Sequence, residues 1–188
     1  MKKLLIVVDM QNDFVTGSLG TKEAREITPA IAKYVQNFDG EVIFTRDTHS
    51  EDYMETQEGK KLPVLHCLKE TEGWQIVPQL HNYSADESRC QIFDKPTFGS
   101  TQLAQFVSEN APEEVQLVGV CTGICVLSNA VLIKAFAPEV PVKVIANLCA
   151  CVTPESHETA LKAMETCQIE IIKHLEKRFG SRLSHTVA

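Results

Sequence analysis

The fold is decided by residues 115–127, which read Val-Gln-Leu-Val-Gly-Val-Cys-Thr-Gly-Ile-Cys-Val-Leu. Val115–Val120 has the length and the apolar composition of a buried parallel strand. Gly119 and Gly123 interrupt this run, and a helical segment is expected to begin near Cys125. Cys125 would therefore lie close to the first turn of a helix that directly follows the carboxyl end of a strand. Ligand sites of open α/β sheets form at such strand ends.

This setting favours a reactive thiol at Cys125. A helix N-terminus presents unpaired N–H groups and the positive end of the helix dipole, which lower the pKa of a thiol. The same N–H groups can stabilise the negative oxygen of a tetrahedral intermediate. The alternative is that Cys125 is one more buried, unreactive cysteine, since free cysteines are commonly buried. The local sequence leaves both interpretations open.

Composition limits the class of protein. The chain has 188 residues, of which 44% are hydrophobic and 23% are charged, and this fits one globular domain over residues 1–188. The net charge of −7 gives no basic surface for nucleic acid. No apolar run approaches the length of about 20 residues that crosses a membrane. The seven cysteines, an odd number, fit free thiols in a cytoplasmic protein better than a disulfide framework. The composition does not indicate whether the protein is a monomer or a homo-oligomer.

Short apolar runs alternate with amphipathic stretches, which is the pattern of βαβ units and a mostly parallel sheet. The expected strands are 4–8, 41–45, 91–93, 115–120, 142–148 and 169–172, and the expected helices are 27–38, 100–109, 125–137 and 154–167, with Ser100 and Thr153 as N-caps. Residues 48–91 are polar and weakly periodic, which is typical of a functional insertion. The tail from residue 174 is basic and polar, and it fits either a short helix or a partly frayed end. The expected fold class is α/β.

Three of these elements present an ionisable group at the same edge of the sheet. Asp9 and Lys95 each end an expected strand, and Cys125 lies one turn beyond another. Right-handed βαβ crossovers place the carboxyl ends of parallel strands on one edge, so the three side chains can converge. A carboxylate beside a thiol can act as its general base, and an ammonium keeps that carboxylate ionised. The pattern predicts nucleophilic catalysis, with charges on a solvated sheet edge as the alternative.

A second polar group consists of Asp47 and His49, followed by His66. Residues 47 and 49 are two apart at an extended strand end and project to the same side. One carboxylate and two imidazoles suit zinc, manganese or iron(II). The spacing alone favours a turn-capping aspartate with surface histidines, because such short motifs are common by chance.

Five motifs occur along the chain in a fixed order. They are Asp9-Met10-Gln11-Asn12-Asp13-Phe14, Asp47-Thr48-His49, Pro63 with His66-Cys67, Lys95-Pro96 with Phe98-Gly99-Ser100, and Gly119-Val120-Cys121-Thr122-Gly123-Ile124-Cys125-Val126. Together they resemble the isochorismatase-like cysteine hydrolases and, within that family, the nicotinamidase/pyrazinamidase branch. The resemblance extends over residues 3–172, which is nearly the whole chain.

The resemblance implies a three-layer α/β/α sandwich around a six-stranded, mainly parallel sheet. It implies a catalytic triad of Asp9, Lys95 and Cys125. It also implies an oxyanion hole formed by the backbone amides of Cys121 and Cys125, with a cis peptide bond between Val120 and Cys121.

The implied activity is hydrolysis of nicotinamide, or of a close heteroaromatic amide, to the acid and ammonia. In this branch a divalent metal, zinc before manganese or iron, is held at positions matching Asp47, His49 and His66 and binds the ring nitrogen of the substrate. An aromatic residue matching Phe14 packs on the ring. A hydrolase of another small amide or carbamoyl compound and a non-catalytic binding module are the alternatives. Isochorismate cleavage is disfavoured because that branch usually lacks the nucleophilic cysteine.

Two departures from the family pattern concern the substrate more than the reaction. A tryptophan often precedes the proline of the motif that contains His66, and here that position is Leu62. Trp74 is the one tryptophan that can take its place. An aspartate or asparagine commonly follows the threonine of the nucleophile loop, where this chain has Gly123.

Overall fold

The centre of the fold is a six-stranded sheet with the strand order β3-β2-β1-β4-β5-β6. The computed structural model describes residues 2–85 and 90–173. Every pair of neighbouring strands is parallel. The strands are β1 (Leu4–Val8), β2 (Glu41–Asp47), β3 (Cys90–Lys95), β4 (Val115–Val120), β5 (Val142–Ala150) and β6 (Glu170–Ile172). The expected α/β class and the parallel sheet are confirmed.

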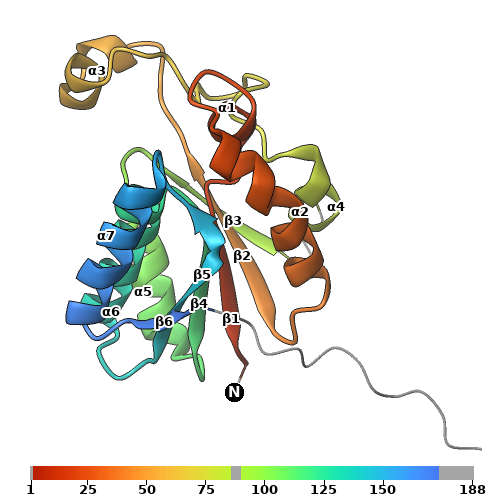
Figure 1. Ribbon diagram of the computed structural model, residues 1–188, viewed down its shortest axis with the longest axis vertical. Coiled ribbons are helices and arrows are strands. Elements are labelled where there is room, and N and C mark those ends of the chain that lie inside the picture. The colour runs from red at the N-terminus through yellow and green to blue at the C-terminus, as the bar shows by residue number, and fades with distance from the viewer. Residues whose placement is uncertain (1, 86–89, 174–188) are drawn as a thin grey trace, which may run out of the picture.

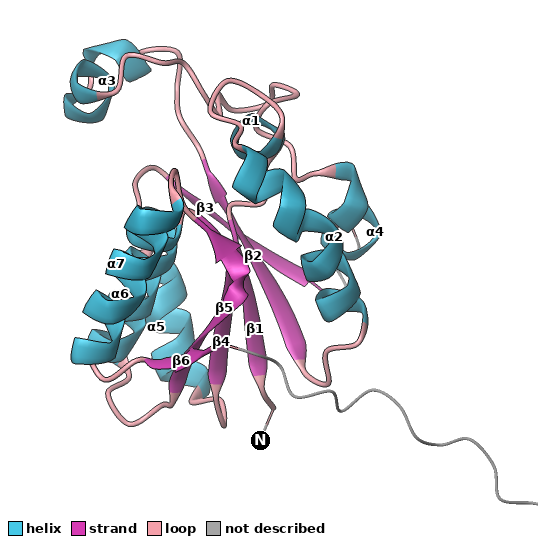
Figure 2. Cartoon of the chain, viewed as in Figure 1, coloured by secondary structure: helices cyan, strands magenta, loops and turns pink. Residues whose placement is uncertain are grey.

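Helices cover both faces of this sheet and make the three-layer sandwich (Figures 1 and 2). One face carries α5, α6 and α7, and the other carries α2 with the shorter α1 and α4. The helices are α1 (Asn12–Val15), α2 (Lys22–Gln36), α3 (Gln57–Lys61), α4 (His81–Ser84), α5 (Thr101–Asn110), α6 (Leu127–Phe136) and α7 (Pro154–Thr166), with the short turns η1 (Tyr53–Glu55), η2 (Pro78–Leu80) and η3 (Thr122–Val126). No helix in the described part of the chain is long and apolar enough to span a bilayer.

The strand β1 shows how the sequence builds the two cores. All of its side chains are buried. Leu4, Ile6 and Val8 join the cluster that packs against α5, α6 and α7, whereas Leu5 and Val7 join the cluster that contains α2. Successive side chains of a strand point to opposite faces, so an uninterrupted apolar run fits a strand covered on both sides.

The expected helix caps are present, but two helix starts differ from the expectation. The helix expected from residue 27 is α2, which begins at Lys22 after the N-cap Thr21, whose hydroxyl accepts from the Ala24 N–H at 3.0 Å. The Ser100 hydroxyl accepts from the Leu103 N–H (3.1 Å), and the Thr153 hydroxyl accepts from the Ser156 N–H (3.1 Å). The helix expected from Cys125 begins instead with the π-helical turn η3, and α6 follows it. The expected tail from residue 174 lies outside the described residues.

The insertion between β2 and β3 contains short helices rather than a structureless loop. Among them, α3 projects beyond the carboxyl ends of the strands (Figure 1). The sheet order changes direction at β1, since β2 lies on one side of it and β4 on the other. Sites of open α/β sheets form at the strand ends where the order changes in this way.

Gly119 sets how closely β1 and β4 approach at this point. Its φ is +115°, which other residues rarely adopt, and a Cβ there would lie 2.1 Å from the Val8 carbonyl oxygen. We expect Gly119→Ala to lower the free energy of unfolding by at least about 2 kcal/mol, because strain and overpacking add. Denaturant unfolding measures this. In Gly99→Ala the new methyl group meets the flexible end of the Leu132 side chain, so its cost should be smaller; equal costs would contradict the explanation.

Candidate active site

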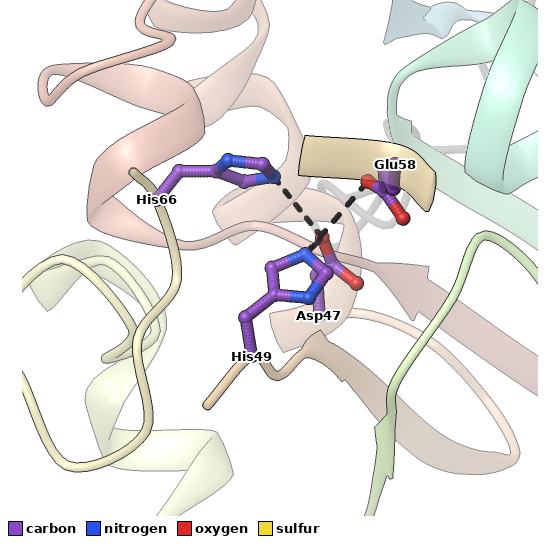
Figure 3. A group of neighbouring side chains, drawn as sticks. All are labelled: Asp47, His49, Glu58 and His66. Atoms are coloured by element: carbon purple, nitrogen blue, oxygen red, sulfur yellow. Dashed lines mark hydrogen bonds and ion pairs between the residues drawn. The ribbon is translucent and has the colours of Figure 1, made fainter. Parts of the chain in front are cut away.

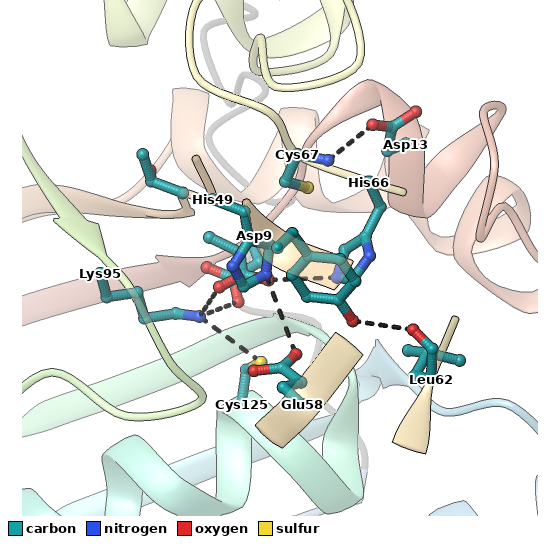
Figure 4. A network of polar contacts seen from close by, with 12 residues as sticks. Asp9, Asp13, His49, Glu58, Leu62, His66, Cys67, Lys95 and Cys125 are labelled. Carbon is teal, nitrogen blue, oxygen red and sulfur yellow. Dashed lines mark hydrogen bonds and ion pairs between the residues drawn. The ribbon is translucent and has the colours of Figure 1, made fainter. Parts of the chain in front are cut away.

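Three side chains from separate elements meet at the carboxyl edge of the sheet (Figure 4). Lys95 Nζ lies 2.7 Å from Asp9 Oδ2 and 3.5 Å from Cys125 Sγ. All three residues are buried, with exposed fractions of 0% for Asp9, 1% for Lys95 and 5% for Cys125. The structure therefore brings the predicted triad into contact, and a solvated sheet edge does not describe these charges.

Asp9 is held in one orientation at the end of β1. Its Oδ1 accepts from the Thr45 hydroxyl at 2.7 Å, and its φ of 50° places a non-glycine residue in the left-handed region. Burial raises the pKa of Asp9, and the Lys95 ammonium opposes that rise. A carboxylate in these surroundings accepts a proton more readily than an exposed one.

Lys95 is the shared cation of the site. Besides Asp9, its ammonium contacts Asp47 Oδ1 at 3.3 Å. Burial alone would lower the pKa of Lys95, but the neighbouring Asp9, Cys125 and Asp47 raise it above its usual value. Lys95 therefore stays protonated and compensates the buried carboxylates.

Cys125 differs from the expectation in one respect. A helix N-terminus was expected to lower the pKa of its thiol, but burial and then the Asp9 charge raise it, and Lys95 only partly opposes this. The cost of placing a thiolate in a fully enclosed position outweighs the helix dipole. The resting group is therefore a neutral thiol, and its activation requires a base.

The loop that leads from β4 to Cys125 is tightly folded. The Val120–Cys121 peptide bond is cis, as the resemblance implies. The Cys121 carbonyl accepts from the N–H groups of Ile124 and Val126 at 3.0 and 3.1 Å. Use of the Cys121 and Cys125 amides as an oxyanion hole stays a prediction.

A possible metal-binding group lies next to these residues (Figure 3). It contains Asp47, His49 and His66, as predicted, together with Glu58, and their ligand atoms all lie within 4.8 Å of one another. The His66 Nδ1 faces the Val64 carbonyl at 2.8 Å, which directs Nε2 toward Asp47. A histidine ligand is usually oriented by such a bond on its other nitrogen.

The charge state of Asp47 also suits a ligand. Burial would raise its pKa, but hydrogen bonds with His49 and His66, and the Lys95 charge, hold that pKa well below its usual range. Gln11 fixes the backbone here, since its Oε1 accepts from the Asp47 N–H (2.7 Å) and its Nε2 donates to the Asp47 carbonyl (2.8 Å). The donor set fits a divalent transition metal, because it combines imidazole and carboxylate.

Sequence reasoning missed Glu58 and Tyr53. Glu58 lies on α3, a short helix with no strong periodic pattern, and its carboxylate is 3.8 Å from His49 Nε2. The Tyr53 ring lies 4.5 Å from that of His49 and 5.0 Å from that of His66, and its hydroxyl donates to the Leu62 carbonyl. Their position depends on how the insertion folds back over the sheet, which no local pattern indicates.

Two aromatic residues, Phe14 and Trp74, are the candidates for contact with the substrate ring. The half-buried Phe14 ring lies 5.6 Å from the His66 ring, beside the possible metal-binding group. Trp74 instead contacts Arg46, whose guanidinium lies 3.6 Å from the ring centroid, and its indole N–H donates to Thr48 at 2.8 Å. Trp74 therefore supports the chain between Asp47 and His49.

Comparison with known proteins places this architecture in a family. The Isochorismatase domain profile matches residues 3–176. This chain belongs to the isochorismatase family. An uncharacterized isochorismatase family protein PncA of Bacillus subtilis is 34% identical over 143 residues, covering 70% of this chain and 78% of the relative. The nicotinamidase of Saccharomyces cerevisiae is 28% identical over 174 residues, covering 69% and 80% respectively.

A solved family structure agrees with the fold. The pyrazinamidase of Pyrococcus horikoshii, crystallised in complex with zinc, superposes with a TM-score of 0.78 at 27% identity. The alignment covers 93% of this chain and 100% of that structure. The likeness therefore extends over the sheet, its helices and the insertion that carries His66.

Proposed function

We propose that this member of the family is a cysteine-dependent amidase that hydrolyses nicotinamide, or a close heteroaromatic amide, to the acid and ammonia. The observation that carries the proposal is the buried contact of Asp9, Lys95 and Cys125 beside the group of Asp47, His49 and His66. The relatives named nicotinamidase and pyrazinamidase support the choice of substrate class.

The first half of the reaction forms a thioester. The Cys125 thiol gives its proton to Asp9, and the sulfur attacks the amide carbonyl carbon. The backbone amides of Cys121 and Cys125 are assigned to the developing oxyanion. As the tetrahedral intermediate collapses, the C–N bond breaks, and Asp9 returns the proton to the departing ammonia.

The second half regenerates the enzyme. A water molecule gives a proton to Asp9 and attacks the thioester carbonyl, and the C–S bond then breaks. The acid leaves, and Cys125 recovers its proton. Lys95 keeps Asp9 in the ionised form that both halves require, because its ammonium lies 2.7 Å from the Asp9 carboxylate.

Asp47, His49 and His66 would hold a divalent metal, with zinc as first choice and manganese or iron as alternatives, and Glu58 is near enough to contribute a ligand. The metal would supply a Lewis acid for a substrate ring nitrogen. The half-buried Phe14 ring, beside His66, is placed to pack on the substrate ring. The triad and this neighbouring group together suit a substrate that carries both an amide and a heteroaromatic ring nitrogen.

The proposed activity is tested by measuring ammonia release from nicotinamide, pyrazinamide and a series of aliphatic amides, with and without added zinc, manganese or iron. We expect the two heteroaromatic amides to be the best substrates. Faster release from an aliphatic amide or a carbamoyl compound would assign a different substrate class to the same triad. Release from none of them by folded, metal-loaded protein would contradict the proposal.

A metal-content prediction is independent of turnover. His66→Ala removes one of the proposed ligands, so we expect affinity for the metal to fall by at least about 100-fold. Loss of a residue that only hydrogen-bonds to a metal ligand already costs about 10- to 100-fold, and loss of a ligand should cost at least as much. Competitive titration with a chelating dye measures this. The control is His81→Ala, which changes an exposed histidine outside the group. Unchanged affinity in His66→Ala would remove His66 from the ligand set.

A further inference from the structure

Two cysteines lie beside the active site, and their side chains have no role in the mechanism above. Cys121 follows the end of β4, and Cys151 follows the end of β5. After an irregularity in the ladder between these strands, Val120 pairs with Ala150. The next residue on each chain is therefore a cysteine. Neighbouring strands lie about 4.8 Å apart, which is within the range of Cα separations that a disulfide bridges.

The two thiols already interact. Each thiol is the largest single influence on the pKa of the other. The Cys151 sulfur also lies against the nucleophile loop, since a Cβ built on Gly123 would be 3.6 Å from it. The register of the strand ends therefore places the two cysteines side by side.

The pair combines one reactive and one protonated sulfur. The neighbouring Cys121 thiol, helped by Ser156 and the backbone N–H groups of Gly123 and Val152, lowers the pKa of Cys151 to about 5. The Cys151 side chain, with burial, raises the pKa of Cys121. A peroxide oxidises a thiolate to a sulfenic acid, and an adjacent thiol then converts the sulfenic acid to a disulfide. Cys125, whose thiol is neutral, is less reactive at rest.

A small oxidant can reach Cys151. Its residue is only 5% exposed, but it lines a cavity of about 250 Å³ bordered by α2, β5 and α7. Glu23 and Glu26 also line this cavity. The negative charges of these two side chains repel a negatively charged oxidant, such as an anionic small-molecule disulfide. A small neutral oxidant such as hydrogen peroxide is not repelled.

We propose that Cys121 and Cys151 form a peroxide-sensitive dithiol that closes reversibly into a disulfide beside Cys125. The Cys151 thiolate attacks one peroxide oxygen, the O–O bond breaks, and the other oxygen leaves as hydroxide, which is protonated to water. The sulfur of Cys121 then attacks the resulting sulfenic acid, the S–O bond breaks, and a second water leaves with the Cys121 proton. The two thiols supply the two electrons that reduce the peroxide.

The test is peptide mapping after hydrogen peroxide treatment of the reduced protein, followed by alkylation and digestion without reductant. Trypsin leaves Cys90, Cys121 and Cys125 on one peptide, because it does not cleave between Lys95 and Pro96, and leaves Cys149 and Cys151 on another. We expect these peptides to be cross-linked in wild type, with fragmentation placing the bond between Cys121 and Cys151, and dithiothreitol should separate them. Cys149→Ala should keep the cross-link, and Cys151→Ala should lose it.

Three outcomes would overturn the proposal: no cross-link in peroxide-treated wild type, a bond to Cys125, or a cross-link that persists in Cys151→Ala. Thermal unfolding establishes that each variant is folded, and Cys151→Ser replaces Cys151→Ala if the latter is not. The readout is a covalent bond and not turnover. A protein without amidase activity would still form it, so failure of this proposal is distinguishable from failure of the proposed function.

Discussion

Cys125→Ala is expected to reduce amide hydrolysis by about 10⁴-fold or more while the protein remains folded, since loss of a nucleophile in a comparable unit costs up to about 10⁶. The residue is small and buried, so the substitution removes one sulfur atom from the contact with Lys95 and leaves the backbone of the loop unchanged. Ammonia release measures turnover, and thermal unfolding measures stability.

Cys149→Ala is the matched control for this prediction. Cys149 is as buried as Cys125, at 5% exposed, but its thiol donates to the Leu117 carbonyl on β4, and among the described residues no hydrogen bond or ion pair joins it to Asp9, Lys95 or Cys125. We expect Cys149→Ala to retain activity. Equal losses in the two variants at equal stability would mean that a buried thiol is needed for packing and would leave the nucleophile unassigned.

Lys95→Met is expected to give the second largest effect, and one that depends on pH. The substitution preserves the bulk of the side chain but removes the positive charge that contacts Asp9 and Asp47. The pKa of Asp9, already raised by burial, should then rise further, because the Lys95 charge that opposes the rise is lost. Because Asp9 must be ionised to accept the thiol proton, the acid limb of the pH–rate profile moves to higher pH.

The size of the loss follows from that shift. At low pH, where wild-type Asp9 is still ionised but Asp9 of Lys95→Met is protonated, turnover of Lys95→Met should be about 10- to 1,000-fold lower than that of wild type. At pH values above both acid limbs the difference should be smaller. Stability should fall by about 3–5 kcal/mol, since two buried carboxylates lose their counter-charge. Lys143→Met is the control, because Lys143 pairs with Glu114, away from the triad, at 3.0 Å. An acid limb that does not move in Lys95→Met would show that Lys95 does not set the charge of Asp9.

The meeting of Asp9, Lys95 and Cys125 could be predicted because it depends on a general rule. Parallel strands joined by right-handed crossovers place their carboxyl ends together, so a polar residue at the end of an apolar run carries positional information. The same rule brings Asp47 and His49 to this edge. His66 lies in the irregular insertion, so its residue type suggested a ligand but only the resemblance supported its position beside Asp47 and His49.

Other features depend on tertiary contacts that leave no local pattern. Glu58 joins the histidines only because α3 folds over the strand ends, and the pKa of Cys125 rises because the site is enclosed. The alignment of Val120 with Ala150, each directly followed by a cysteine, requires the irregular register between β4 and β5. A sequence identifies the residue types at strand ends more readily than the burial of those residues or the register of the strands.

We propose that Cys125 carries the acyl group during turnover. The most direct measurement is mass spectrometry of protein mixed with nicotinamide, quenched in acid at successive times within the first turnovers and digested. We expect a transient mass increase of one pyridine-carbonyl group that fragmentation places on Cys125, with no such increase in Cys125→Ala. Ammonia release accompanied by an acyl group on any other residue, or sustained release by Cys125→Ala, would contradict it.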